Sequence, residues 1–168
     1  MHINITANHH TMLFNFIFAI SLTFSFSIAG LLINNAIKDK PFYGSLSNFN
    51  FIKSETANRY LGVLYLKKVL ATTFLGGLNQ TIKIKERPDP VKLRALRKEM
   101  TSAEIGHLIA FVCVIITILF FKIKHQHTDA FIPMLVSNVV FHIYPPLVQQ
   151  YNKRRLDKII AHFSYRNA

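Results

Sequence analysis

The sequence has no tryptophan, one cysteine and only eight acidic residues among its 168 positions. Because Cys113 is alone, no disulfide can form within the chain, and the Cys and His spacings of a structural zinc site are absent. The motifs of a zinc hydrolase, a serine-hydrolase elbow, a phosphate-binding loop and a dinucleotide-binding turn are missing too. We therefore expect no metal site and no resident cofactor.

What the chain has in excess is apolar residues, which make up 51% of it and are gathered into long runs. Three runs are about long enough to cross a bilayer at about 1.5 Å per helical residue: 12–33, 105–121 and 130–148. Serine and threonine in the first run can bond back to the helix backbone, so they do not oppose insertion. The sequence predicts an all-α, polytopic membrane protein with about three transmembrane helices in a single domain over residues 1–168.

Residues 55–78 mix charged and apolar side chains. Lys67 and Lys68 fall in the middle of this segment, where a membrane span would have to bury both at a cost of about 2.5 kcal/mol each. We therefore expect an amphipathic helix in the headgroup region, with residues 63–74 not crossing the bilayer. The Gly76-Gly77 pair should end it.

Basic residues flank the apolar runs. Thirteen of the twenty Lys and Arg lie in residues 38–98, and five follow Tyr151, whereas the first ten residues have none. The positive-inside rule then predicts an N-terminus outside, and residues 38–98 and the C-terminus in the cytoplasm. A net charge of +12 distributed in this way favours membrane lipids as partners and argues against nucleic acid.

Polar residues of the second and third runs should meet at the cytoplasmic level. Glu104 and His107 are three apart and share a helix face. The third run returns in the opposite direction and ends on polar residues at the same depth: Gln149, Tyr151, Asn152 and Arg155. These residues are candidates for a site, although a structural pair of Glu104 and His107 that locks the helices together is equally open.

A second polar pair lies deeper, where Asn138 and His142 are four apart and precede Pro145 and Pro146. The prolines should kink or break the helix and free backbone carbonyls near His142. Ionisable residues in a span usually face a partner or a wet cavity, which makes His142 a third candidate. Asn138 is also readily explained as a hydrogen-bonding residue between helices.

Two blocks of sequence carry a resemblance to a known family. The block EMTSAEIGHLIAF is followed about thirty residues later by SNVVFHIYPPLVQQYNKRRL. Together they resemble the glycosyl-4,4'-diaponeurosporenoate acyltransferase family, in which AExxH precedes a helix and a later helix ends on Q-R-Y-N-R-x-R-L. Gln150 and Lys153 stand where that pattern has arginine. The matching positions are Ala103, Glu104, His107, Asn138, Pro145, Gln149, Tyr151, Asn152, Arg155 and Leu156.

The resemblance implies that an acyl chain moves from a thioester co-substrate to a lipidic, carotenoid-type glycoside at the cytoplasmic face of a bacterial inner membrane. His107 would be the general base and Glu104 would fix its tautomer. Donor phosphates would meet the basic residues 83–98. Six residues would bind substrate: Asn138, His142, Gln149, Tyr151, Asn152 and Arg155. The alternative is a non-catalytic small subunit or assembly factor, held by these polar residues to other membrane protein subunits.

Overall fold

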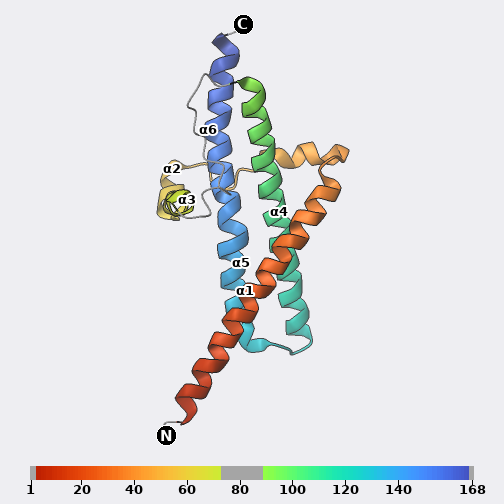
Figure 1. Cartoon of the computed structure of the whole chain (residues 1–168), viewed down its shortest axis with the longest axis vertical. Helices are drawn as coiled ribbons and strands as arrows, with labels where there is room; N and C mark the ends of the chain where they lie inside the picture. The colour runs from red at the N-terminus through yellow and green to blue at the C-terminus, as the bar shows by residue number, and fades with distance from the viewer. Residues whose placement is uncertain (1–2, 73–88, 167–168) are drawn as a thin grey trace. The chain divides into compact units, whose positions relative to one another are not determined.

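The structure is a computed structural model that describes residues 3–72 and 89–166, all of whose regular elements are helical (Figure 1). The elements are α1 (Ile3–Ile37), the 3₁₀ helix η1 (Pro41–Asn48), α2 (Glu55–Tyr60), α3 (Val63–Thr72), α4 (Pro90–Ile123), the 3₁₀ turn η3 (Thr128–Ala130), α5 (Phe131–Asn138), the π-helical turn η4 (Val139–Ile143) and α6 (Tyr144–Arg166). Three helical segments are long and apolar enough to cross a membrane: Thr11–Ile37, Pro90–Ile123 and Thr128–Phe163. The predicted all-α membrane fold is therefore confirmed.

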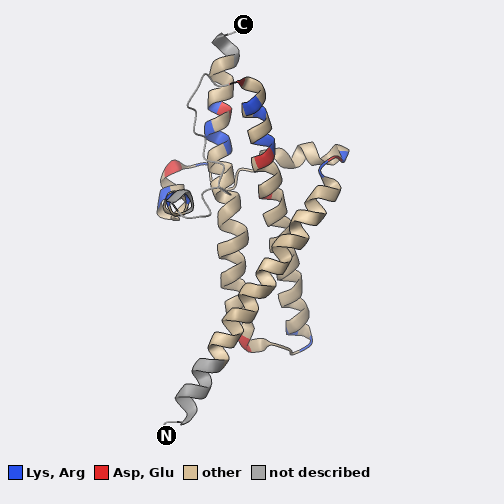
Figure 2. Cartoon of the chain, viewed as in Figure 1, with Lys and Arg blue, Asp and Glu red and all other residues tan. Residues whose placement is uncertain are grey.

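The chain forms two compact units, each described by itself. The apolar unit consists of Met1–Ala36 and Gly106–Ile143, and the basic unit of Ile37–Ile105 and Tyr144–Ala168. Lys and Arg gather on the first half of α4 and the middle of α6, whereas α1 has none (Figure 2). The single domain over residues 1–168, with spans at 12–33, 105–121 and 130–148, stays a prediction.

Within the apolar unit, α1 presents large apolar side chains outward, among them Phe14 and Leu32 at 65% and 63% exposure. A surface of this kind suits a lipid environment, since soluble monomers rarely expose it over such a length. Thr23 and Ser25 each donate to the carbonyl four residues earlier, as the sequence predicts, and Ser27 Oγ lies 3.2 Å from the Thr23 carbonyl. Their hydroxyl groups thus remain hydrogen-bonded within an apolar helix.

Helix α1 approaches α4 closely at a pair of glycines. A Cβ added to Gly30 would stand 2.3 Å from the carbonyl oxygen of Gly106 and 3.0 Å from the Ala110 Cβ. Contact at this distance requires a residue without a side chain, which is how small residues let membrane helices approach one another. This crossing sets the position of the neighbouring turns of α1, including the turn that carries Ser27.

The sequence predicts that the third apolar run kinks or breaks at its prolines. In the structure the helix does not break there. It passes instead from α5 through the π-helical turn Val139–Ile143 into α6. Pro145 and Pro146 fall in the first turn of α6, where a missing N–H is tolerated. The π-helical turn accommodates the loss of the backbone hydrogen bonds that the prolines cannot donate, and it carries His142.

In the basic unit, the predicted amphipathic helix over residues 55–78 is two helices where the structure describes it. Helix α2 ends because Gly62 adopts a left-handed conformation with φ of +72°, which glycine takes without strain. The prediction of one helix over residues 55–78 does not use this glycine. Helix α3 is described over Val63–Thr72, ten residues or about 15 Å. Residues 73–88, including the Gly76-Gly77 pair, lie outside the described residues.

Helices α4 and α6 pack side by side in the basic unit, around a small core of Leu93, Met100 and Leu156 (Figure 1). An ion pair reinforces this packing, since Arg97 Nε donates to Asp157 Oδ1 at 2.5 Å and Arg97 Nη2 donates to Oδ2 at 3.2 Å. Side chains on the two helices are thereby brought within hydrogen-bonding distance.

We expect Gly30→Ala to lower the free energy of unfolding by about 1–3 kcal/mol, because the new methyl group meets a backbone oxygen that cannot turn aside. Thermal unfolding in detergent measures this change. Gly44→Ala is the matched control, since a Cβ there meets nothing within 4 Å. Equal melting temperatures for the two variants would contradict the close crossing.

Candidate functional site

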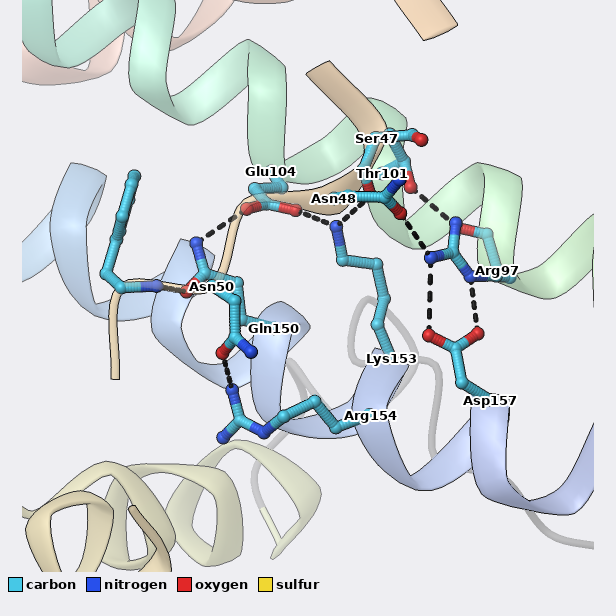
Figure 3. Close-up of polar contacts among 11 residues, drawn as sticks. Ser47, Asn48, Asn50, Arg97, Thr101, Glu104, Gln150, Lys153, Arg154 and Asp157 are labelled. Carbon is cyan, nitrogen blue, oxygen red and sulfur yellow. Dashed lines mark hydrogen bonds and ion pairs between the residues drawn. The ribbon is translucent and has the colours of Figure 1, made fainter. Parts of the chain in front are cut away.

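The carboxylate of Glu104 is fully buried in the basic unit and is held by two side chains of α6 (Figure 3). Gln150 Nε2 donates to Glu104 Oε1 at 2.7 Å, and the ammonium of Lys153 forms a short ion pair with Oε2. We call Glu104, Gln150 and Lys153 the carboxylate cluster. The sequence predicts Gln149, Tyr151, Asn152 and Arg155 at this level, whereas the partners of Glu104 in the structure are their neighbours Gln150 and Lys153.

The same two side chains also hold the end of η1 and the residues that follow it. Lys153 Nζ donates to the Ser47 carbonyl at 3.0 Å, and Gln150 Oε1 accepts from the Phe51 backbone N–H at 2.8 Å. Arg154 Nη1 donates to Asn50 Oδ1 at 2.6 Å beside them. The carboxylate cluster thus joins three chain segments, which is the behaviour of a structural junction (Figure 3).

Gln150 and Lys153 were not among the residues that we selected from the sequence. They are three apart and therefore share a face of α6, as Glu104's partners must. The sequence does mark both positions, because each differs from the arginine of the family pattern. That difference alone does not identify them as hydrogen-bond partners of Glu104.

The other selected residues of α6 have different surroundings. The ammonium of Lys67 lies 4.9 Å from the centre of the Tyr151 ring and docks α3 on α6. Burial, and after it the positive charge of Arg155, lower the pKa of the Lys67 ammonium. Asn152 is buried and Arg155 is exposed. Gln149 Oε1 is buried with no hydrogen-bond partner among the described residues.

Two clefts adjoin the carboxylate cluster within the basic unit. A basic cleft of about 330 Å³ has five cationic side chains and one acidic side chain in its wall. Its charged lining residues are Lys38, Asp39, Lys40, Arg94, Arg97 and Lys98. A polar cleft of about 210 Å³ lies between the segment 47–50 and α6. Arg97 and Ser47 line both clefts.

A second group of polar side chains lies in the apolar unit. His142 is fully buried, and its Nε2 lies 2.9 Å from the hydroxyl oxygen of Ser27 on α1. Its Nδ1 lies 2.8 Å from Asn138 Oδ1. The ring of His107 lies 5.9 Å from that of His142, centre to centre. We call Ser27, His107, Asn138 and His142 the histidine cluster.

The hydrogen-bond network determines the tautomer of His142. Asn138 Nδ2 donates to the Phe111 carbonyl at 3.2 Å, so the amide oxygen of Asn138 faces the imidazole. An amide oxygen only accepts, and therefore Nδ1 of His142 carries the hydrogen. In the neutral ring Nε2 is then an acceptor, and the Ser27 hydroxyl donates to it.

His107 lies within hydrogen-bonding reach of the Phe141 carbonyl. That carbonyl has neither an α-helical nor a π-helical donor, because positions four and five residues later are Pro145 and Pro146. The sequence predicts that the prolines free a carbonyl near His142, and the Phe141 carbonyl is one that lacks these donors. The pairing of Glu104 with His107 stays a prediction, and the partners that the structure gives Glu104 are Gln150 and Lys153.

Within the described part of the chain, no group of three or more His, Cys, Asp or Glu side chains is arranged to hold a metal ion. His125 and His127 occupy the turn after α4 with positive φ values. His127 stacks on Phe18 with ring centres 5.0 Å apart. These contacts give His127 a packing role.

The family model described as glycosyl-4,4'-diaponeurosporenoate acyltransferase (CrtO) matches residues 39–162. The chain belongs to this family. The match includes the carboxylate cluster and every member of the histidine cluster except Ser27. Comparison with the curated proteins and with the solved structures found no match. The resemblance carried by Glu104, His107 and the polar end of α6 is thereby confirmed.

Replacement of Glu104 by alanine should lower the free energy of unfolding by about 3–5 kcal/mol, because it leaves the ammonium of Lys153 buried without its counter-charge. Unfolding in detergent, followed by heat or denaturant, measures this loss. The double variant Glu104→Gln with Lys153→Met should recover much of it.

Asp157→Asn is the matched control, because the Arg97–Asp157 pair is partly exposed and should be worth no more than about 1 kcal/mol. If the Glu104 and Asp157 variants lose the same stability, the carboxylate cluster is not the junction described above.

Proposed function

We propose that this protein is a membrane acyltransferase that moves an acyl chain from a thioester donor to a hydroxyl of a lipidic, carotenoid-type glycoside at the cytoplasmic face. The observation that carries the proposal is the family match over residues 39–162. The name of that family specifies an acyl transfer to a glycosyl diaponeurosporenoate. The apolar helices suit a donor chain and an acceptor that both dissolve in lipid.

The reaction needs a base and no redox partner. In the net reaction the acceptor oxygen becomes bonded to the acyl carbon and gives up its proton through a base, and the carbon–sulfur bond breaks to release a thiol. Imidazole is the side chain best suited to this proton transfer near neutral pH. His107 and His142 are neighbours in the apolar unit, so we assign the base to this pair.

Glu104 supports a different role in this proposal. Its side chain is sealed from solvent and both of its oxygens accept bonds, which favours a structural function over direct contact with substrate. The cations of the basic cleft fit the phosphates of a nucleotide-bearing thioester donor, since Lys and Arg are the usual phosphate-binding side chains. Substrate contacts of Gln149, Tyr151, Asn152 and Arg155 stay predictions.

In a purified, lipid-reconstituted assay, wild-type protein should convert a long-chain coenzyme A thioester and a carotenoid glycoside into the acylated glycoside. His107→Ala and His142→Ala should each lower the rate by about a hundredfold or more and leave the protein abundant, because the lost step is proton transfer. An alkyl thioester without phosphates should show a higher KM if the basic cleft binds the donor.

Absence of product from well-folded wild-type protein would refute the enzyme proposal. The non-catalytic alternative, a small subunit or assembly factor, is favoured by the sealed state of Glu104. Under that alternative His107→Ala lowers abundance or releases the chain from a larger complex, while wild-type protein makes no product.

For orientation, we propose an outer N-terminus and a cytoplasmic C-terminus in a bacterial inner membrane, on the strength of the charge asymmetry. In a chain with Cys113 replaced by serine, a cysteine at the exposed position Ser45 should resist an impermeant thiol reagent added to intact cells. A cysteine at the exposed Gln126 should react and is the matched control. The reverse pattern of labelling would overturn the orientation.

A further inference from the structure

A serine, a histidine and an asparagine form a continuous hydrogen-bonded line inside the apolar unit. The line runs from the Ser27 hydroxyl to His142 Nε2 at 2.9 Å, and from His142 Nδ1 to Asn138 Oδ1 at 2.8 Å. From the geometry we infer that Ser27 is a covalent nucleophile that takes the acyl chain from the thioester donor. This inference rests on the proposed acyl transfer and deepens it.

The arrangement matches what an activated serine requires. A hydroxyl must face the unprotonated nitrogen of an imidazole, and a third group must hold the ring in that tautomer. Asn138 does so, because its amide nitrogen is anchored to the Phe111 carbonyl and its oxygen is directed at Nδ1. Ser27 then donates to His142, as a nucleophile donates to its base.

The backbone around the three residues restrains them. His142 lies in the π-helical turn between α5 and α6, and π turns of this kind occur often at functional sites. Gly30, one helical turn after Ser27, is pressed against the carbonyl of Gly106. The Ser27 turn of α1 is thereby held at a set distance from α4, and the hydroxyl is held at His142.

Access from the lipid side suits an acyl substrate. Ser27 is only partly buried, whereas His142 and Asn138 are buried behind it. Phe24 and Ile28 flank Ser27 and are exposed to 53% and 62%. An acyl chain in the bilayer would pass along these apolar side chains before its carbonyl carbon reached the hydroxyl.

Neighbouring hydroxyls of α1 lack this arrangement. Ser25 is exposed and donates to the Ser21 carbonyl in its own helix. Ser27 has one hydroxyl hydrogen and two acceptors within reach, the Thr23 carbonyl at 3.2 Å and His142 Nε2 at 2.9 Å. Bonding within the helix therefore accounts for Ser25, whereas the nearer acceptor for the hydrogen of Ser27 is His142.

The reaction takes place in two balanced steps. Ser27 Oγ bonds to the thioester carbonyl carbon while its proton passes to His142 Nε2, and the carbon–sulfur bond breaks so that the thiolate leaves with that proton as a thiol. The product is an acyl ester on Ser27. The sugar hydroxyl then bonds to the ester carbon, the bond between that carbon and Ser27 Oγ breaks, and the sugar proton passes through His142 to Ser27 Oγ, which restores the free serine.

The test compares wild type, Ser27→Ala and the matched control Ser25→Ala in lipid, by intact-protein mass and by product formation. Incubation with a long-chain coenzyme A thioester and no acceptor should add the mass of one acyl group to wild type and to Ser25→Ala. Peptide mapping should locate it at Ser27. Ser27→Ala should gain no mass, and its rate of product formation should be lower than that of wild type by about a hundredfold or more.

Each result separates this inference from the proposed function. Product formation by Ser27→Ala at the wild-type rate would overturn the inference and leave the acyl transfer intact. Product formation by wild type with no acyl adduct under rapid quenching would do the same. An adduct at Ser27 without product from a carotenoid glycoside would support the nucleophile and refute that acceptor.

Discussion

A carboxylate that has lost contact with water must find its hydrogen bonds and its counter-charge inside the protein, and Glu104 finds both on α6. The partners that it recruits, Gln150 and Lys153, use their remaining polar atoms on the backbone of residues 47–51. One buried charge thus determines where α4, α6 and the segment after η1 meet. Gln150 and Lys153 of this junction also line the polar cleft.

The histidine cluster obeys the same requirement without a charge. Two consecutive prolines remove the helical donors of the Phe141 carbonyl, and His107 lies where it can supply a replacement. The π turn that accommodates the prolines carries His142, whose two nitrogens are satisfied by Asn138 and Ser27. In an apolar environment a polar group without a hydrogen-bond partner costs free energy, so each group of the histidine cluster requires a partner among its neighbours.

Much of this arrangement follows from the sequence, because hydropathy, charge and helical spacing are local properties. They are sufficient for the all-helical fold and its three apolar helices. Spacing could not select Ser27, since Ser21, Thr23 and Ser25 look alike until the Gly30 crossing turns one of them toward His142. Nor could it distinguish Gln150 and Lys153 from Gln149 and Asn152, because that depends on the rotation of α6 about its axis.

The pair Glu104 and His107 reads as one motif in the sequence, yet its two members have unlike chemistry in the fold. Both oxygens of Glu104 accept bonds from side chains of α6, and protonation would leave the Lys153 ammonium buried without its counter-charge. A neutral imidazole with a lone pair toward a hydroxyl carries no such penalty, and His142 is in that state beside His107. In the proposed reaction the imidazoles therefore take part in bond formation, and the carboxylate holds α4 and α6 together.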